Sequence, residues 1–426
     1  MAVIFYPARQ IAAVVESAEG TQTAAGSVAV ADLIQTLDPQ IQLTPNRFER
    51  NLARRGFGMV PSHYAKGTAR LTFGVELAGN TDNASALTAI VSGGLPKWSK
   101  LLEACGSVAK SVGSLGTGAI TGGPIQHGET ITATVGGNTA VALGYTYTPE
   151  NPITVELAGA ALAAGGATTS VSSSTFTIAG SGVLLGNVLA GYAWHPQSVE
   201  ASNRTLTFHL NIGGQRFQVY GARGTCSFAF NVHDRVIANF TFDGIFDEVD
   251  ASAALSETGS TAFKAMTPPA FVAAASTLTP RAADGTFGTA LSGSDLCWDS
   301  ATFDLGVSTV MRKCANGTDG YIAAVITGRA PTFSFNPDDP GVASYEYIEK
   351  LMEGTQARGY LQWGASGAIG NRFLLKLPHL QSQTTTIGER DTRMNQSIAF
   401  DATLGSFEGA ADRSVGFDNE WLLINY

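Results

Sequence analysis

The sequence predicts a mainly β (α+β) protein in which one β-rich unit with a single helix occurs twice. Two observations predict this fold. Apolar residues alternate with period two over long stretches of the 426-residue chain, and short residue groups return in the same order in both parts of the sequence. A third observation concerns the surface. Only 14% of the residues are charged and 49 are glycine, so we expect a small, neutral surface that further copies of the chain largely cover.

Antiparallel strands are predicted where apolar residues alternate on either side of glycine-containing turns. Leu206, Phe208 and Leu210 fall on one face of a strand, and Cys226 and Phe228 fall on one face of a later strand. The connections in this region read GG and GARG, and glycine tolerates the positive φ angles that tight turns need. The sequence therefore predicts a meander of half-buried strands.

Two helices are predicted, over residues 95–106 and 344–354. Each has apolar residues at helical spacing and ends at a glycine. We expect one stripe of each helix to pack onto a sheet. The stripe residues are Trp98, Leu101, Leu102, Ile348, Leu351 and Met352.

Four short echoes in the sequence define the repeat. They are KLLE at 100–103 with KLME at 350–353, TF at 72–73 and 332–333, RF at 216–217 and 372–373, and FD at 242–243 and 400–401. The interval between helix and meander is longer in the first unit, by roughly the length of residues 107–200.

The longer interval predicts an insertion in the first unit. Residues 107–200 are rich in Gly, Ala, Thr and Ser and contain strand-like pieces, so we interpret them as a small β-rich appendage rather than a disordered segment. The expected organisation is a first domain over 1–250 that carries this insertion, a linker over 251–290 and a second domain over 291–426.

Charge and targeting signals narrow the function classes. The formal net charge of −9 argues against a surface that grips nucleic-acid phosphates. The N-terminus lacks the basic region of a signal peptide, and no run reaches the length of a membrane span. We therefore expect the chain to fold in the cytoplasm, with no membrane partner.

Catalytic and metal-binding patterns are not found in the sequence. The four cysteines form no C-x-x-C pair, the six histidines are scattered, and neither a nucleophile elbow nor a P-loop occurs. The acidic stretches at 243–250 and 336–340 are interpreted as solvated loops, and Arg54 and Arg55 as salt-bridge partners between subunits rather than DNA contacts. We expect no enzyme activity, no cofactor and no metal site.

Several segments resemble the major tail tube proteins of long, noncontractile-tailed bacteriophages (siphophages). The N-terminal segment over 16–58 carries Glu-Ser, Gly-Thr, Thr-Pro and Glu-Arg groups of that family, and "ARLTFGVELAG", "WSKLLEACG" and "YGARGTCSFAF" look like its strand, helix and meander. The likeness covers most of the chain outside the linker and residues 107–200, which depart from the family's pattern.

The resemblance implies a structural virion protein that is made late and assembled in the host cytoplasm. Each unit would be a tail-tube domain of two packed antiparallel sheets with one flanking helix. Subunits would join into rings that stack into a tube, through which double-stranded DNA passes during ejection without specific binding. Because such rings are usually built from six tube domains, two domains per chain imply a trimer with a pseudo-sixfold lumen. The implied partners are the chain itself and other tail proteins, such as the tape measure and the tail terminator.

One face of the last strand of each meander is a candidate lumen surface. The residues on it are Asn239, Thr241, Asp243, Ser397 and Asp401, which alternate with apolar residues of the core. An outer solvent face is the other interpretation of this pattern.

Other classes of β-protein share this composition. A capsid or decoration protein is the nearest alternative, and a surface-layer or adhesin-type protein would be expected to carry a secretion signal. A carbohydrate-active enzyme would need paired carboxylates beside an aromatic cleft.

Overall fold

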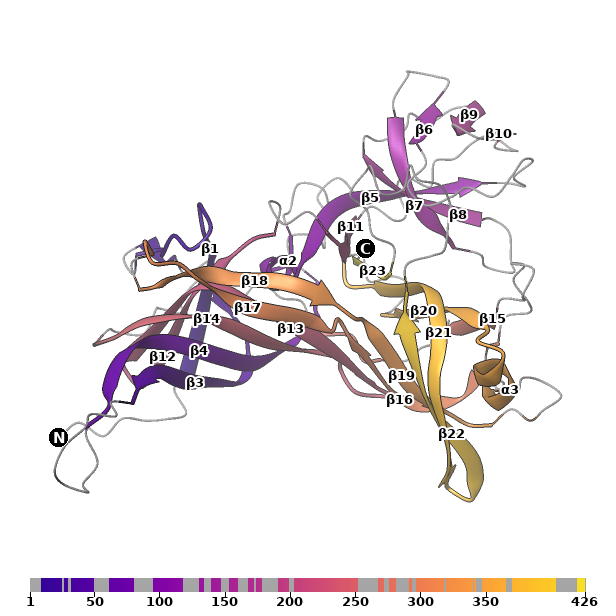
Figure 1. Ribbon diagram of the computed structural model, residues 1–426. Helices are drawn as coiled ribbons and strands as arrows, with labels where there is room; N and C mark the ends of the chain where they lie inside the picture. The colour runs from indigo at the N-terminus through magenta and orange to yellow at the C-terminus, as the bar shows by residue number, and fades with distance from the viewer. Residues whose placement is uncertain are drawn as a thin grey trace.

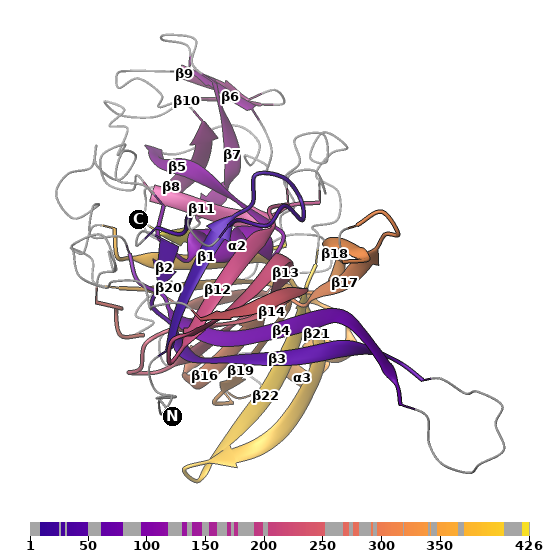
Figure 2. The same cartoon turned by 90° about the vertical axis from the view of Figure 1, so that its left-hand side faces the viewer.

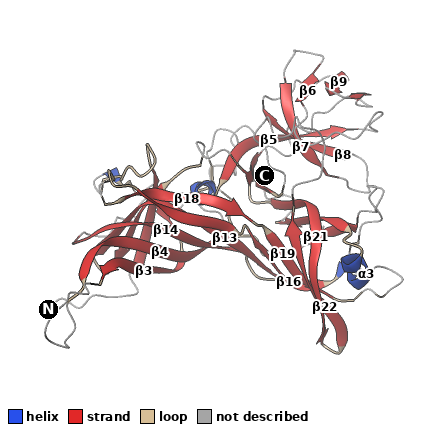
Figure 3. Ribbon diagram, viewed as in Figure 1, coloured by secondary structure: helices blue, strands red, loops and turns tan. Residues whose placement is uncertain are grey.

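Antiparallel strands dominate the computed structural model of the chain, which is mainly β as the alternation predicted (Figure 3). The structure describes residues 9–24, 27–29, 32–49, 61–79, 95–117, 130–133, 139–146, 153–159, 168–171, 174–177, 191–198, 203–251, 267–271, 276–280, 291–292, 296–317, 319–339, 341, 347–364, 370–403 and 420–425. Among these residues, 21 strands are hydrogen-bonded into one continuous network, and two more form a separate hairpin.

Six strands of the first half lie side by side in the order β3–β4–β14–β13–β12–β1 (Figure 1). The short strand β2 pairs with β1. Their bounds are β1 Arg9–Val15, β2 Leu33–Ile34, β3 Leu37–Phe48, β4 His63–Glu76, β12 Leu206–Ile212, β13 Gln215–Asn231 and β14 Ile237–Ala251. The expected meander is the run β12–β13–β14, with Gly213 and Gly214 in the first turn. The connection expected at GARG is wrong, because residues 221–224 lie inside β13.

The second half has the same strand order, β16–β19–β22–β21–β20–β15. The bounds are β15 Thr277–Pro280, β16 Trp298–Asp304, β19 Thr332–Pro337, β20 Gln356–Trp363, β21 Phe373–Arg390 and β22 Arg393–Ala402. A last strand, β23 Leu422–Asn425, pairs with the beginning of β21. Because β15 lies within 251–290, the linker expected there is too long, and the second sheet begins before residue 291.

A bulge of the same size occurs in β3 of the first half and in β16 of the second. From Leu37 to Gln40, β3 advances by three residues while the paired stretch of β4 advances by two. The same difference occurs from Trp298 to Ala301 of β16, opposite β19. The strand order and the bulge therefore recur together.

A hairpin interrupts the second half between β16 and β19. It consists of β17 Val307–Lys313 and β18 Tyr321–Arg329, which pair only with each other within the described chain and lie over β13 and β14 (Figure 1). In the first half, the corresponding stretches of β3 and β4 stay paired and project away from the sheet (Figure 2).

Residues 107–200 contain β-structure, as their composition predicted. The strands are β5 Ser107–Thr117, β6 Thr130–Ala133, β7 Thr139–Thr146, β8 Ile153–Gly159, β9 Thr168–Val171, β10 Ser174–Thr177 and β11 Gly191–Pro196. Strands β6 to β10 are attached through β8 to β5, while β11 pairs with both β5 and β23. The base of this segment is thus part of the main body, because Trp194 in β11 is fully buried.

Helix α2, Ser99–Ala104, is shorter than the sequence suggested. Helix α3 is Tyr347–Met352, and residues 344–346 of the expected helix lie outside the described residues. Trp98, Leu101 and Leu102 are buried beside α2 or within it. In α3, Ile348 and Leu351 are half-buried.

The packing expected for Met352 is wrong, because its side chain is 81% exposed. Tyr347 occupies the inward position of α3 and is only 2% exposed. Met352 follows five residues later, which places it about 140° around the helix from Tyr347. A helix of this length buries one side only, and Met352 lies on the other.

Aromatic residues form a core that continues from one half into the other. Phe73 contacts Phe240 and Phe242 in the first half at centroid distances of 5.8 and 5.9 Å. Phe230 of the first half contacts Trp363 of the second in an edge-to-face pair at 5.5 Å. The two halves therefore share buried apolar surface as well as hydrogen bonds.

Candidate assembly site

A seam of β-pairing joins the two halves of the chain. Strand β13 pairs antiparallel with β16, from Ser227 opposite Asp304 to Asn231 opposite Ser300. Within it Phe228 lies opposite Phe303, their rings stack at 6.0 Å, and both side chains are buried. The last residues of β13 thus join the sheet of the first half to β16, the outer strand of the second half.

A buried arginine links the first half to the hairpin β17–β18. Arg223 of β13 is 2% exposed and donates hydrogen bonds to the carboxylate of Glu19 at 2.9 Å and to the carbonyls of Ala324 at 2.9 Å and Asn203 at 2.8 Å. A buried guanidinium is tolerated when its donors are engaged in this way. Because Ala324 belongs to β18, this side chain holds the hairpin against the first half.

The hairpin β17–β18 docks on the first half through a second apolar cluster. Tyr220 and Ile245 from the first half pack with Tyr321 and Met311 from the hairpin. The Tyr220 hydroxyl donates to Asp319 at 2.6 Å. Burial, followed by the nearby Asp319 carboxylate, raises the pKa of Tyr220, so the hydroxyl keeps its proton and remains a donor.

A lysine adds an ionic link at the same place. The Lys66 ammonium lies 2.8 Å from Asp247 and 3.0 Å from Asp319, and its hydrogen bond to Asp247 is the main cause of its raised pKa. The side chain of Lys66 is 46% exposed, so this link orients the hairpin more than it stabilises the fold.

The candidate lumen residues lie on β14 and β22, on the face opposite the core. Phe240, Phe242, Ile398 and Phe400 are buried, while the intervening residues are exposed or half-buried. Asn239 and Ser397 are exposed, and Thr241 and Asp401 are half-buried. Buried and more exposed residues therefore alternate in the same way along β14 and β22.

Asp243 differs from the other candidates because it is engaged within the chain. Its carboxylate accepts two hydrogen bonds from Arg70, at 2.8 and 3.1 Å, and one from the Thr309 hydroxyl of the hairpin at 3.1 Å. In the second half, Asp401 lies opposite Thr332 in the register that places Arg70 opposite Asp243. The negative charge is therefore compensated in one half by a residue that the other half lacks.

Sequence reasoning missed a buried polar group beside α2. Glu103 accepts a hydrogen bond from Ser99 at 2.9 Å and pairs with Arg204 at 2.9 Å, while the Trp194 indole donates to Ser99 at 2.8 Å. Burial raises the pKa of Glu103, although Arg204 opposes this. Trp194 and Arg204 lie far from α2 in the sequence, so no local pattern indicates this group.

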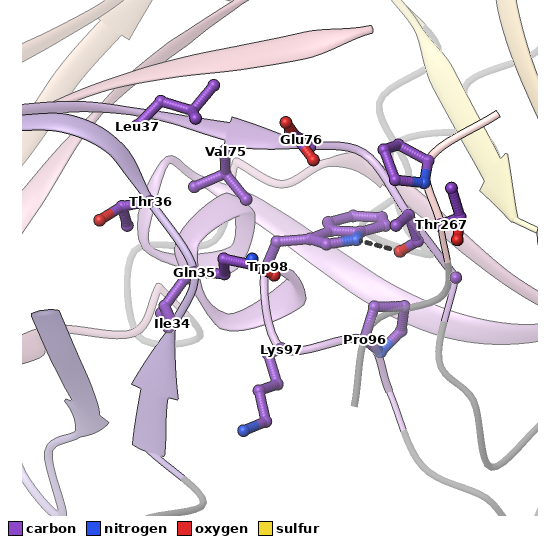
Figure 4. A pocket seen from close by; sticks show the side chains of 13 residues that line it. Ile34, Gln35, Thr36, Leu37, Val75, Glu76, Pro96, Lys97, Trp98 and Thr267 are labelled. Carbon is purple, nitrogen blue, oxygen red and sulfur yellow. Dashed lines mark hydrogen bonds between the residues drawn. The ribbon is translucent and has the colours of Figure 1, made fainter. Parts of the chain in front are cut away.

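A cavity of about 380 Å³ lies beside Trp98, which donates its indole hydrogen to the carbonyl of Ala78 at 2.8 Å (Figure 4). Its two charged side chains are both engaged. Glu76 pairs with Arg235 at 2.8 Å, and Lys97 donates to the carbonyl of Leu33 at 3.3 Å. The cavity lining thus offers one ion-paired carboxylate rather than the carboxylate pair of a hydrolase.

Metal-ligand clusters and membrane-spanning helices are not found among the described residues. The described part of the chain holds no group of three or more His, Cys, Asp or Glu side chains arranged for a metal ion. None of its helices combines the length and apolar character needed to cross a bilayer. Cys105 and Cys226 are buried, and burial raises the pKa of both thiols.

An open strand edge lies at each end of the joined halves. Within the described chain, β3 pairs with β4 alone, and residues 382–390 of β21 pair with β22 alone. Large apolar side chains stand beside these edges: Ile387 is 56% exposed on β21, and Leu43 and Phe48 are 42% and 57% exposed on β3. An open, apolar edge is a template for pairing with another strand.

The comparisons with known proteins do not assign the chain to a family. No protein-family model matches the chain, and no curated protein matches it. The open edges of β3 and β21 and the seam between the halves are the structural features that bear on function.

Proposed function

We propose that the chain is a structural virion protein that self-assembles into stacked rings and forms the tail tube of a siphophage. In this proposal the two halves are tandem tail-tube domains. The tube is the channel for DNA, and the chain has no enzymatic role. The tape measure and tail terminator are its expected partners within the tail.

One observation carries the proposal: two units of identical strand order are already joined edge to edge within one chain, and each end of the joined pair leaves an edge open. Because the two open edges belong to different strands, pairing between chains is head to tail. Such heterologous contacts produce a closed ring or a helical filament. A ring of six units then contains three chains.

The surface and the candidate lumen are consistent with a channel for DNA. Asn239, Thr241 and Ser397 carry no positive charge, so phosphates that pass them meet amides and hydroxyls. The carboxylate of Asp401 adds repulsion, whereas Asp243 is compensated by Arg70. A lumen of this kind guides DNA without holding it.

A capsid or decoration protein, or a surface-layer protein, is the alternative that assembles from the same kind of β-unit. Closed capsid shells and flat layers need contacts in more than one direction. The open edges of β3 and β21 lie at opposite ends of the joined halves and favour growth around a ring.

Purified protein tests the proposal directly. Mass photometry and negative-stain microscopy over a range of concentrations should show a particle with the mass of three chains of 44.3 kDa each, with a central hole, and stacks of it at high concentration. A protein that stays monomeric at all concentrations, or that forms shells or sheets, would contradict the proposal.

A further inference from the structure

The register of the seam can be transferred from inside the chain to its open ends, because β14 and β22 pair with equivalent strands on both sides. Positions are matched through these pairings rather than by counting along β21, which has a bulge between Ser382 and Thr384. Phe242 of β14 faces Leu71 of β4, and Phe400 of β22 faces Phe333 of β19. Leu71 in turn faces Ile41 of β3, and Phe333 faces Phe303 of β16. Ile41 therefore occupies in the first half the position that Phe303 occupies in the second.

The other side of the seam has its counterpart on β21. Phe228 of β13 faces Ala238 of β14, and Ile387 of β21 faces Gln396 of β22. Ala238 lies four residues before Phe242, and Gln396 lies four residues before Phe400. Ile387 is therefore the counterpart of Phe228.

The geometry points to a specific contact between two copies of this chain: residues 386–388 of β21 in one copy pair antiparallel with residues 40–42 of β3 in the next, with Ile387 opposite Ile41. This inference rests on the proposed function and deepens it, because it names the partner surface and its register. The two flanking pairs are Thr386 opposite Gln42 and Gly388 opposite Gln40.

The residues at the two edges have the chemistry that this register needs. In the seam, the buried pair Phe228 and Phe303 is flanked by small or polar pairs, Ser227 with Asp304 and Ala229 with Thr302. The edge residues repeat this pattern, with an apolar pair at the centre and small or polar residues on both sides. A shift by one residue would turn Ile387 away from Ile41, since side chains alternate along a strand.

Exposure also favours this contact. Ile387 is 56% exposed and Ile41 is half-buried, whereas their counterparts Phe228 and Phe303 are 2% and 0% exposed. Residues 386–389 are all exposed, so no other described segment covers this edge. Edge strands in proteins that remain monomeric are usually blocked by charges, proline or a covering segment. Pro39 and Pro45 of β3 and Glu389 of β21 lie outside the stretches 40–42 and 386–388, which contain neither proline nor charge. A second copy would bury Ile387 as the seam buries Phe228.

Disulfide cross-linking tests the register. Cys297 and Cys314 are first replaced by serine, because they are the cysteines that are not buried. One protein then carries Ile387→Cys and another carries Ile41→Cys. Directly paired residues of an antiparallel ladder lie about 4.5–5.5 Å apart, within the range that a disulfide spans.

Mixing the two single variants under mild oxidation should give one covalent heterodimer and no larger species. A protein with both substitutions should give linear and closed trimers on a non-reducing gel. The slipped pair, Ile387→Cys with Gln42→Cys, is the matched control and should link at least tenfold less. Ala229→Cys with Thr302→Cys, which face each other in the seam, should link within one chain and shows that the oxidation conditions suffice.

A charge at the edge provides an independent test. Ile387→Lys should abolish ring formation while the melting temperature of the monomer stays unchanged. Val310→Lys is the matched control, because Val310 is also 56% exposed but lies on β17, away from both edges. It should assemble as the unaltered protein does.

The outcomes separate this inference from the proposed function. Rings that form without the Ile387–Ile41 link, or that form with Ile387→Lys, overturn the register and leave the ring proposal intact. Head-to-tail links that form without any rings or tubes support the register and contradict the tail tube. A protein that never self-associates overturns both.

Discussion

Replacing Leu102 by alanine should cost about 3–4 kcal/mol of the free energy of unfolding. Leu102 lies in α2 and is 0% exposed. The change removes three carbon groups from the core, which amounts to about 2.4 kcal/mol at about 0.8 kcal/mol each. The cavity left behind adds about 1 kcal/mol, because a close-packed core relaxes only in part.

Urea unfolding followed by tryptophan fluorescence measures this loss, with Trp98 next to α2 as a natural reporter. Met352→Ala in α3 is the control. Because Met352 is 81% exposed, its replacement should change the stability by less than about 0.5 kcal/mol. Leu351→Ala, at a half-buried site, should fall between the two. A loss below about 1 kcal/mol for Leu102→Ala, or equal losses at Leu102 and Met352, would refute the packing described for the two helices.

Four further changes test other features. Joining Val112 to Gly191 through Asn-Gly in place of residues 113–190 should leave a soluble, folded protein by circular dichroism, because these two residues face each other in the β5–β11 pair. Stability should fall as the pH drops from 6.5 to about 4, by at most about 3 kcal/mol, and His209→Gln should flatten this part of a urea-midpoint profile. Burial lowers the pKa of His209 from 6.5 to about 4, so the folded state takes up this proton at a lower pH than the unfolded state does. Removing residues 420–426 should abolish soluble expression, since Trp421 to Ile424 are buried and β23 links β21 to β11. If β14 and β22 line the channel, Asn239→Lys with Ser397→Lys should leave rings intact and slow DNA ejection from particles.

Each of these four predictions has an outcome that would contradict it. Loss of soluble protein on replacing 113–190 would mean that the appendage supports the core. A pH profile unchanged by His209→Gln would place the proton uptake elsewhere. A soluble, cooperative protein without residues 420–426 would contradict the role of β23. Normal ejection by the lysine variant would place the channel on another face.

Alternation predicted the burial along β14 and β22, because the side that faces the core is a local property of a strand. It failed on β12, where Thr207 and His209 on the other face are buried as well. Phe240, Phe242, Ile398 and Phe400 are all buried, as the period of two predicted. The echo FD at 242–243 and 400–401 also marks equivalent positions. The TF echo is misaligned by two residues, because Phe73 faces Phe240 whereas Phe333 faces Phe400.

The seam could not be predicted from the sequence. The alternation around Phe228 and Phe303 is the same as that of any half-buried strand, and it carries no information on which strand is the partner. The hairpin β17–β18 was not predicted either, because alternation does not show where a pair of strands leaves its sheet. It leaves at Gly306, where φ is positive and the carbonyl of Ala330 approaches too closely for a side chain. The exposure of Met352 depended on where a short helix begins, which is the least certain feature of a helical pattern.

The pairing of β1 with β12 has a kinetic consequence. These strands are separated by all of the intervening first half, including the appendage, so their contact closes a very long loop and should form late in folding. Until β1 pairs with β12, the edge of β12 is open, whereas β1 covers it in the folded protein. A second chain competes with β1 for that edge, and the competition grows with protein concentration. Slow synthesis at low temperature should therefore raise the yield of correctly folded chains more than it does for a protein of the same size built from local contacts.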